Sequence, residues 1–259
     1  MVGDISGADR AVVATRTPLH FGRIVVIGGG CYGAWYTQQL AKAIARGAVV
    51  AREIIVVDHN AHCLVSQRLE RDEYGTAPVR VVNQEWNDYV ATWLASGTDA
   101  LNTDTMVPSP LMPHLCLDWL LLRARARFPE REISVQPLTV TPPTPWERAA
   151  PDGRHYVSFA TWTCPINCIE PARCPATRET RDWSMPVAIT RYAQQQSTQV
   201  DASLIFHCEH RAYGVGMIDA AGIAAGDDLL AAWTSSAPLR ILVGTVSHCH
   251  GALGVLTVR

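Results

Sequence analysis

The chain has 259 residues, of which 48% are hydrophobic and 18% are charged, and its formal net charge at neutral pH is −2. This length is enough for one large or two modest domains with buried cores. The balanced charge offers no basic surface to nucleic acid, and no segment approaches the roughly 18 uninterrupted apolar residues of a membrane span. We therefore expect neither nucleic-acid binding nor membrane insertion.

Residues 1–22 are predicted to be an N-terminal extension. They contain Asp4 and no apolar stretch of signal-peptide length, so we expect a cytoplasmic protein. In a reducing compartment the eight cysteines are not expected to form a disulfide framework. Cys31, Cys63 and Cys116 stand apart from the others in apolar or helical contexts, as small core residues often do.

The first motif in chain order is a glycine-rich turn between a predicted strand and a predicted helix. An apolar run at residues 23–28 leads into the turn, and the helical pattern AWYTQQLAKAIA follows it. The glycines permit a tight turn, a close approach of backbone to a pyrophosphate, and packing of helix on strand. We expect a dinucleotide to bind at Gly28, Gly29, Gly30, Cys31, Tyr32 and Gly33.

A second predicted strand, residues 53–58, ends in Asp58. An acid in this place can bond the ribose hydroxyls of the cofactor, which favours NAD over NADP. The interval from Gly28 to Asp58 is longer than usual. A domain that has lost its ligand and an S-adenosylmethionine site are the alternatives, although the IGGGxxG form argues against the latter.

Further alternation of helix and strand follows, with helices predicted at 60–72, 88–95 and 115–128 and strands at 79–83 and 99–104. Together with IGGGCYG and VVD, this order resembles the nucleotide-binding domain of Trk/RCK-type potassium-uptake regulatory proteins over residues 23–128. It resembles the dehydrogenase half of sirohaem synthases less closely. The Trk/RCK resemblance implies a Rossmann-like parallel sheet in a domain at 23–135, with NAD held by Gly28, Gly30, Gly33 and Asp58.

Residues 136–154 contain five of the sixteen prolines and are predicted to link two domains. Beyond them, residues 155–163, 201–207 and 239–247 have the pattern of strands, and residues 222–236 that of a helix. The predicted fold is therefore α/β throughout, with a second, smaller α/β domain at 155–259.

This second domain is rich in cysteine and histidine at the ends of its predicted strands. Cys164, Cys168 and Cys174 follow the first strand, and two short clusters follow the other two. If the three strands share a sheet and run parallel, all these residues meet at one carboxyl edge. We expect a metal centre there, and the candidate ligands in the two clusters are His207, Cys208, His210, His248, Cys249 and His250.

The cysteine spacing favours an iron–sulfur cluster. Cys-x3-Cys-x5-Cys lacks the Cys-x2-Cys knuckle of common structural zinc sites, and prolines follow Cys164 and Cys174. Cys208 or Cys249 is the candidate fourth ligand. Zinc is the alternative, because mixtures of Cys and His suit it, and cysteines without any metal are a third possibility.

Other side chains near the cysteines have two interpretations each. Glu170 and Glu209 are either acceptors that support the ligands or surface carboxylates. Trp162 and Trp183 are expected to cover the cysteine loop. Three arginines also lie near the cysteines in the sequence. They either supply positive charge beside the thiolates or simply solvate the loop, and they are Arg173, Arg178 and Arg181.

The leading functional hypothesis is an NAD-linked redox protein, either an NAD-dependent oxidoreductase or its subunit, in which the dinucleotide exchanges electrons with the Cys-ligated centre. A hydride carrier and a one-electron cluster normally need a flavin between them, so a redox partner subunit could supply one. The alternatives are an NAD-sensing regulatory module with structural zinc and a sirohaem-synthase-like dehydrogenase and metal chelatase. By analogy with regulatory domains of this fold we expect a homodimer.

Overall fold

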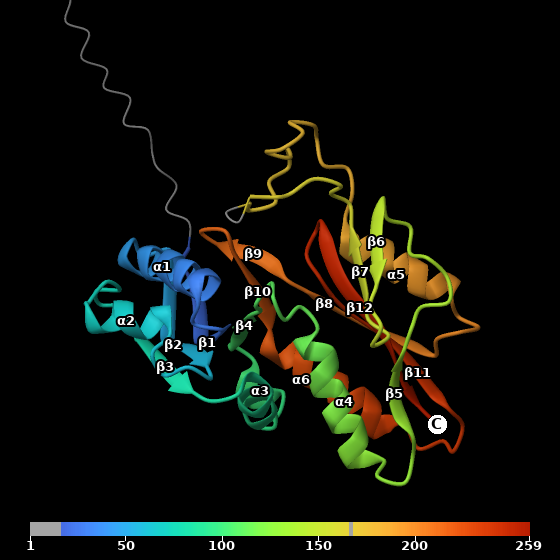
Figure 1. Ribbon diagram of the computed structural model, residues 1–259. Coiled ribbons are helices and arrows are strands. Elements are labelled where there is room, and N and C mark those ends of the chain that lie inside the picture. The colour runs from blue at the N-terminus through green and yellow to red at the C-terminus, as the bar shows by residue number, and fades with distance from the viewer. Residues whose placement is uncertain (1–16, 166–167) are drawn as a thin grey trace, which may run out of the picture.

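The computed structural model describes residues 17–165 and 168–259. The greater part of the expected N-terminal extension, residues 1–16, lies outside this range. The described chain forms a mixed α/β fold with two six-stranded sheets and six α-helices. The sheets lie beside one another with helices between them (Figure 1).

The first sheet is built mainly from the N-terminal half of the chain. Its spatial order is β3 (Val79–Asn83), β2 (Val49–Asp58), β1 (Leu19–Ile27), β4 (Thr105–Val107), β10 (Val215–Asp219) and β9 (Glu209–Ala212). Residues 24–27 of β1 are at most 2% exposed, because helices cover both faces of the sheet at this strand. Such strands are continuous apolar runs rather than alternating ones.

This sheet is mixed, so the prediction of an N-terminal Rossmann-like parallel sheet is wrong. The strands β3, β2, β1 and β4 are parallel. The sheet then continues with β10, which is antiparallel to β4, and with β9, which is antiparallel to β10. Both added strands come from residues 209–219, far beyond the domain to which the sheet was assigned. The Trk/RCK resemblance implied a simple parallel sheet, which the chain does not form.

The second sheet contains the three strands whose ends carry the cysteines and histidines. Its order is β6 (Trp146–Ala149), β7 (His155–Ser158), β12 (His250–Val258), β11 (Leu239–Val246) and β8 (Ala202–His207), and β5 (Ile133–Gln136) also pairs with β12. Because β7 and β11 are both antiparallel to β12, and β8 is parallel to β11, the strands β7, β8 and β11 run in the same direction. Their carboxyl ends therefore share one edge, as predicted, although an antiparallel strand lies among them.

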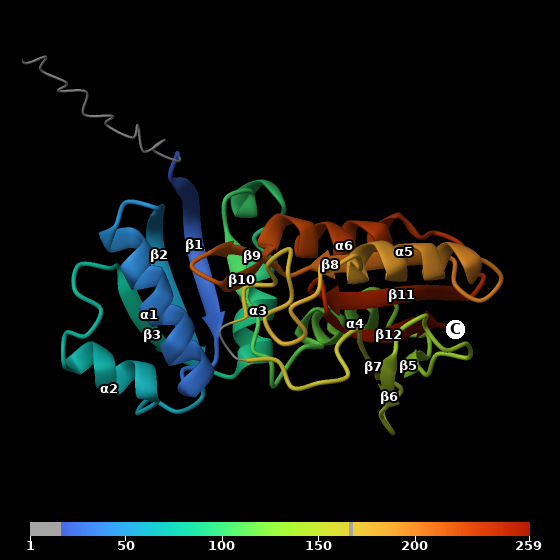
Figure 2. The same cartoon turned by 90° about the horizontal axis from the view of Figure 1, so that it is seen from above.

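The helices and sheets alternate in layers (Figures 1 and 2). On the outer face of the first sheet lie α1 (Cys31–Ala45) and α2 (Leu64–Glu70), and on the outer face of the second lies α5 (Met185–Gln195). Between the sheets lie α3 (Trp86–Leu94), α4 (Leu115–Arg127) and α6 (Ala220–Ala232). One apolar core surrounds these three and joins residues such as Val25 of β1 to Ile241 of β11.

The chain passes from the second sheet to the first at Cys208, between β8 and β9. The predicted linker at 136–154 contains β6 and part of the second sheet's edge, and each sheet contains strands from both sides of it. The predicted strand at 99–104 is instead the 3-10 helix η1 (Asp99–Leu101) and a turn, and β4 starts one residue later. In the described part of the chain, no helix combines the length and the apolar character that crossing a bilayer requires.

Candidate functional site

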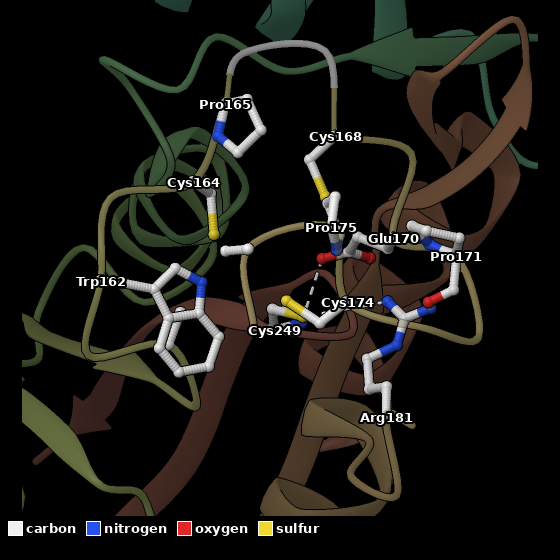
Figure 3. A pocket seen from close by; sticks show the side chains of 12 residues that line it. Trp162, Cys164, Pro165, Cys168, Glu170, Pro171, Cys174, Pro175, Arg181 and Cys249 are labelled. Atoms are coloured by element: carbon white, nitrogen blue, oxygen red, sulfur yellow. Dashed lines mark hydrogen bonds between the residues drawn. The ribbon is translucent and has the colours of Figure 1, made fainter. Parts of the chain in front are cut away.

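Four cysteines surround one hollow at the carboxyl edge of the second sheet. Cys164, Cys168 and Cys174 come from the loop after β7, and Cys249 comes from the turn between β11 and β12. Figure 3 shows the four side chains directed toward the hollow from above and below in the view. The hollow is shallow, and about 10 Å³ of it is accessible to the centre of a water-sized sphere. Its other lining residues are Ala160, Trp162, Pro165, Glu170, Pro171, Pro175, Ala176 and Arg181.

Backbone hydrogen bonds hold the cysteine loop against the β11–β12 turn. The amide of Phe159 donates to the carbonyl of Cys249 at 2.9 Å, and the amide of Met185 donates to the carbonyl of His248 at 3.0 Å. The loop therefore begins and ends on the same turn. The sequence suggested Cys208 or Cys249 as the fourth ligand, and the structure places Cys249 beside the other three cysteines.

Cys174 is fixed by a small network of its own. Its amide donates to Glu179 O at 2.9 Å, and its carbonyl accepts from the Arg178 amide at 2.8 Å. Backbone N–H groups of Thr177 and Ala176 also bond the thiol, and the Thr177 amide is the main reason that the pKa of Cys174 is lowered. Donors that face the sulfur stabilise a thiolate, which is the form that binds metal.

Cys249 lies at the base of the hollow and receives two side-chain donors. Trp183 Nε1 lies 3.3 Å and Arg181 Nη1 lies 3.9 Å from its sulfur. Burial raises the pKa of this thiol, and these two donors partly offset the rise. Trp183 also stacks on Phe159, with 6.0 Å between ring centroids. Trp162 lines the hollow, whereas Trp183, the other tryptophan expected to cover the loop, contacts the sulfur of Cys249.

The pKa of the Cys164 thiol depends on the other three thiols of the hollow. Burial raises its pKa to about 11, and further increases come from Cys168, Cys249 and Cys174. Each of these thiols would repel a thiolate at Cys164 if it were itself ionised. A group of this kind is expected to stay protonated until a cation offsets the repulsion.

Glu170 is a buried carboxylate beside the hollow, with 5% of its side chain exposed. It accepts hydrogen bonds from Ser247 Oγ at 2.7 Å, from the His248 amide at 2.9 Å and from the Cys249 amide at 3.1 Å. Burial alone would raise its pKa, but contacts with His210, Ser247 and the His248 amide lower it to about 2. Glu209, the other predicted acceptor, is a surface residue whose side chain is 54% exposed.

The four histidines of the two clusters lie beside this site but are bonded differently from one another. His207 and His248 meet edge to face, with 5.0 Å between ring centroids. His210 Nδ1 lies 3.3 Å from Glu170, and His250 Nδ1 lies 3.0 Å from Ser158 Oγ. Within residues 17–165 and 168–259, no three His, Cys, Asp or Glu side chains are arranged to hold a metal ion.

Cys208 is separate from the hollow. It is the residue at which the chain changes sheets, and its amide donates to Val246 O at 2.7 Å. Its sulfur lies only 2.7 Å from where a Cβ on Gly216 would be. Burial raises the pKa of this thiol to about 12. Such an environment is that of a packed core cysteine.

The glycine turn has the backbone geometry that its sequence predicts. Gly28 has φ +85°, a conformation that favours glycine. A Cβ on Gly33 would lie 1.8 Å from Gly28 O, whereas one on Gly30 would meet nothing within 4 Å. Gly30 precedes the first residue of α1, Cys31, which is exposed. The turn is thus packed at Gly33 and open at Gly30.

Asp58 supports this turn from the end of β2. Its carboxylate accepts from the Gly29 amide at 2.7 Å and from the Asn60 amide at 2.8 Å, and the residue is 7% exposed. The structure thus gives Asp58 a positional role within the protein. Its expected contact with a cofactor ribose stays a prediction.

Comparison with known proteins identifies a family for the larger part of the chain. Residues 116–259 match the model of the family AF_1314_C, described as "Uncharacterized protein, C-terminal domain", and the chain belongs to this family. The match includes all four cysteines of the hollow and none of the glycine turn. No curated protein and no solved structure matches the chain. The Trk/RCK resemblance is therefore without support from either the comparisons or the sheet.

Proposed function

We propose that this protein is a redox protein whose centre is an iron–sulfur cluster held by Cys164, Cys168, Cys174 and Cys249. The observation that carries the proposal is that these four thiols, from two separate segments, line a single hollow. Four cysteine thiolates are the usual ligand set of both [2Fe–2S] and [4Fe–4S] clusters. When bound, such a cluster accepts and donates single electrons.

Four cysteines can hold either a cluster or a single zinc ion, and the sequence spacing of the three loop cysteines favours the cluster. Zinc requires four ligands to converge at about 2.3 Å from one point. A cluster contains several metal atoms, so its ligands surround a larger space.

The surroundings of the sulfurs also favour a redox role. Trp183 and Arg181 present N–H groups to Cys249, and backbone amides face Cys174. Hydrogen bonds to the sulfurs and the exclusion of water set the reduction potential of a cluster. The positive charge of Arg181 would offset part of the negative charge of four thiolates.

The first test is the metal content of the protein purified without oxygen. We expect a brown protein that absorbs broadly near ~400 nm and contains iron and sulfide. Replacing Cys249 by Ser should remove most of the iron, whereas Cys208→Ser should retain it. A colourless wild type with one zinc per chain would instead support the regulatory module with structural zinc, and full iron content in Cys249→Ser would exclude this ligand set.

We also propose that NAD binds at the glycine turn and exchanges electrons with the cluster, with a partner subunit supplying a flavin between them. The support is local: a turn with φ +85° at Gly28 and open space at Gly30 precedes the 15-residue helix α1. The free N–H groups of such a helix end attract phosphate. NAD would then meet the turn on the side of Gly30.

The proposed binding of NAD at the glycine turn is tested by titrating NAD into the protein in a calorimeter. Gly30→Glu should abolish binding because the carboxylate fills the open space and repels phosphate. The matched control is Gly222→Glu on α6, where a Cβ also meets nothing within 4 Å. Unchanged affinity in Gly30→Glu would refute the pocket without bearing on the four cysteines.

A further inference from the structure

Glu170 joins the two segments that carry the four cysteines. It lies in the loop between Cys168 and Cys174, and its carboxylate bonds three consecutive residues of the β11–β12 turn, the last of which is Cys249. One of these bonds, to the Cys249 amide, is visible beside the hollow in Figure 3. The side chain is 5% exposed, so water does not compete for these donors.

The carboxylate of Glu170 is occupied mainly by contacts within the protein. Oε1 accepts from Ser247 Oγ and the Cys249 amide, while Oε2 accepts from the His248 amide and faces His210 Nδ1 at 3.3 Å. An ionised carboxylate offers about four acceptor positions, and here three take hydrogen bonds while the fourth side faces His210. Its surroundings therefore suit a group that holds protein segments in place rather than one that meets a substrate.

The backbone at Glu170 supports the same conclusion. Its φ is +49°, in the left-handed region that residues with a Cβ rarely adopt. A conformation of this kind persists only where surrounding contacts hold it. Here the contacts that hold it are those that tie the loop to the turn.

We propose that Glu170 is a positioning residue that holds the thiol of Cys249 opposite the three loop thiols before any metal binds. The inference rests on the proposed function in taking these four thiols as ligands. Through His210 on β9, Glu170 also ties the cysteine loop to the first sheet. The folded chain thus holds the two segments that carry the thiols together before any metal binds.

The test is the rate at which iodoacetamide modifies each cysteine in the reduced full chain after treatment with a chelator, followed by mass spectrometry. Glu170→Gln puts an NH₂ group where an acceptor is needed, so one donor of the turn loses its partner. Losing one hydrogen bond to a charged group should speed the modification of Cys249 by about tenfold. Glu179→Gln, an exposed change in the same loop, should leave the rate unchanged.

Cys116 serves as the internal reference for folding, because it is 2% exposed and distant from the loop in sequence. Slow modification of Cys116 together with an unchanged rate at Cys249 in Glu170→Gln would overturn the proposal. If Cys116 also reacts quickly, the variant has unfolded, and Glu170→Asp, which keeps the charge but withdraws the carboxylate from the turn, replaces it. An increase of about threefold at Cys249 is then expected, and no increase counts against the proposal.

Iron and sulfide content after anaerobic reconstitution separates this inference from the function on which it rests. A wild type that takes up no iron refutes the cluster and leaves the modification rates as the test of Glu170. A wild type that takes up iron, with at least half lost in Glu170→Gln and none lost in Glu179→Gln, supports both. Full iron in Glu170→Gln with unchanged rates at Cys249 overturns the positioning role alone.

Discussion

Two glycines of the same turn differ sharply in how much space surrounds them. A Cβ at Gly33 would lie 1.8 Å from a backbone oxygen, while one at Gly30 would be free. We expect Gly33→Ala to lower the free energy of unfolding by about 3 kcal/mol or more, because backbone must move. Gly30→Ala should change it by no more than about 0.5 kcal/mol. Urea denaturation of both variants checks this, and equal losses would show that the turn is packed differently.

Trp183 contributes a single N–H to the sulfur of Cys249, at 3.3 Å. Such a donor stabilises the more negative, reduced state of a cluster, so Trp183→Phe should lower the reduction potential. A loss of about 1 kcal/mol corresponds to a shift on the order of 40 mV for one electron. A redox titration measures the shift, and Trp162→Phe, which lacks this bond, is the control. A potential that rises or stays constant would contradict the bond's assigned role.

Between elements, α4 and α6 are joined by charges as well as by apolar packing. Asp227 of α6 accepts from Arg123 Nε at 2.8 Å and from Arg127 Nε at 2.7 Å. Burial raises its pKa, but the hydrogen bonds from Arg127 and then Arg123 outweigh this and leave the pKa below the usual 3.8. The ionised form is therefore more stable in the folded chain than in the unfolded one.

We expect Asp227→Asn to cost about 1–2 kcal/mol of unfolding free energy at neutral pH. Because the folded pKa is depressed, the difference from the wild type should be complete above about pH 4 and disappear as the pH falls through the folded pKa. Denaturation curves across this range measure it. The neighbouring exposed Asp228→Asn should have little effect, and a difference that grows in acid would contradict the sign.

The elements that the sequence predicted well are those whose signal is local. The strands at β1, β2 and β3 are apolar runs bounded by turns, and α4 was predicted to within one residue. The sequence predictions did not include α5, although Pro186 at its start and the buried stripe of Met185, Ile189, Tyr192 and Ala193 are a helical signal. The pairing of β10 with β4 joins residues more than 100 positions apart, which no local pattern reveals.

For the whole molecule, the candidate site was predictable in its residue types but not in its supports. Strand direction brings Cys249 to the same edge of the sheet as the loop cysteines, and this could be expected once three strands ended in Cys and His. The chain's crossing between sheets at Cys208 removed that residue from the site, and burial made Glu170 a structural acceptor. The position of Cys208 and the role of Glu170 both depend on long-range packing, so the pattern of the sequence could decide neither of them.

The shared core leads to a prediction about folding. One apolar cluster includes Val25 of the first sheet and Ile241 of the second, and β9 and β10 complete the first sheet with residues from the C-terminal half. We therefore expect the described part of the chain to unfold in a single transition, with a calorimetric enthalpy equal to the van't Hoff value.

Fragments 1–140 and 141–259 should each lack a cooperative thermal transition alone, because each loses strands or helices that cover the other's apolar surface. Circular dichroism of the separate and co-expressed fragments checks this, with co-expression expected to restore the transition. A sharp melt of the isolated 1–140 fragment would show that the predicted linker separates two independent domains.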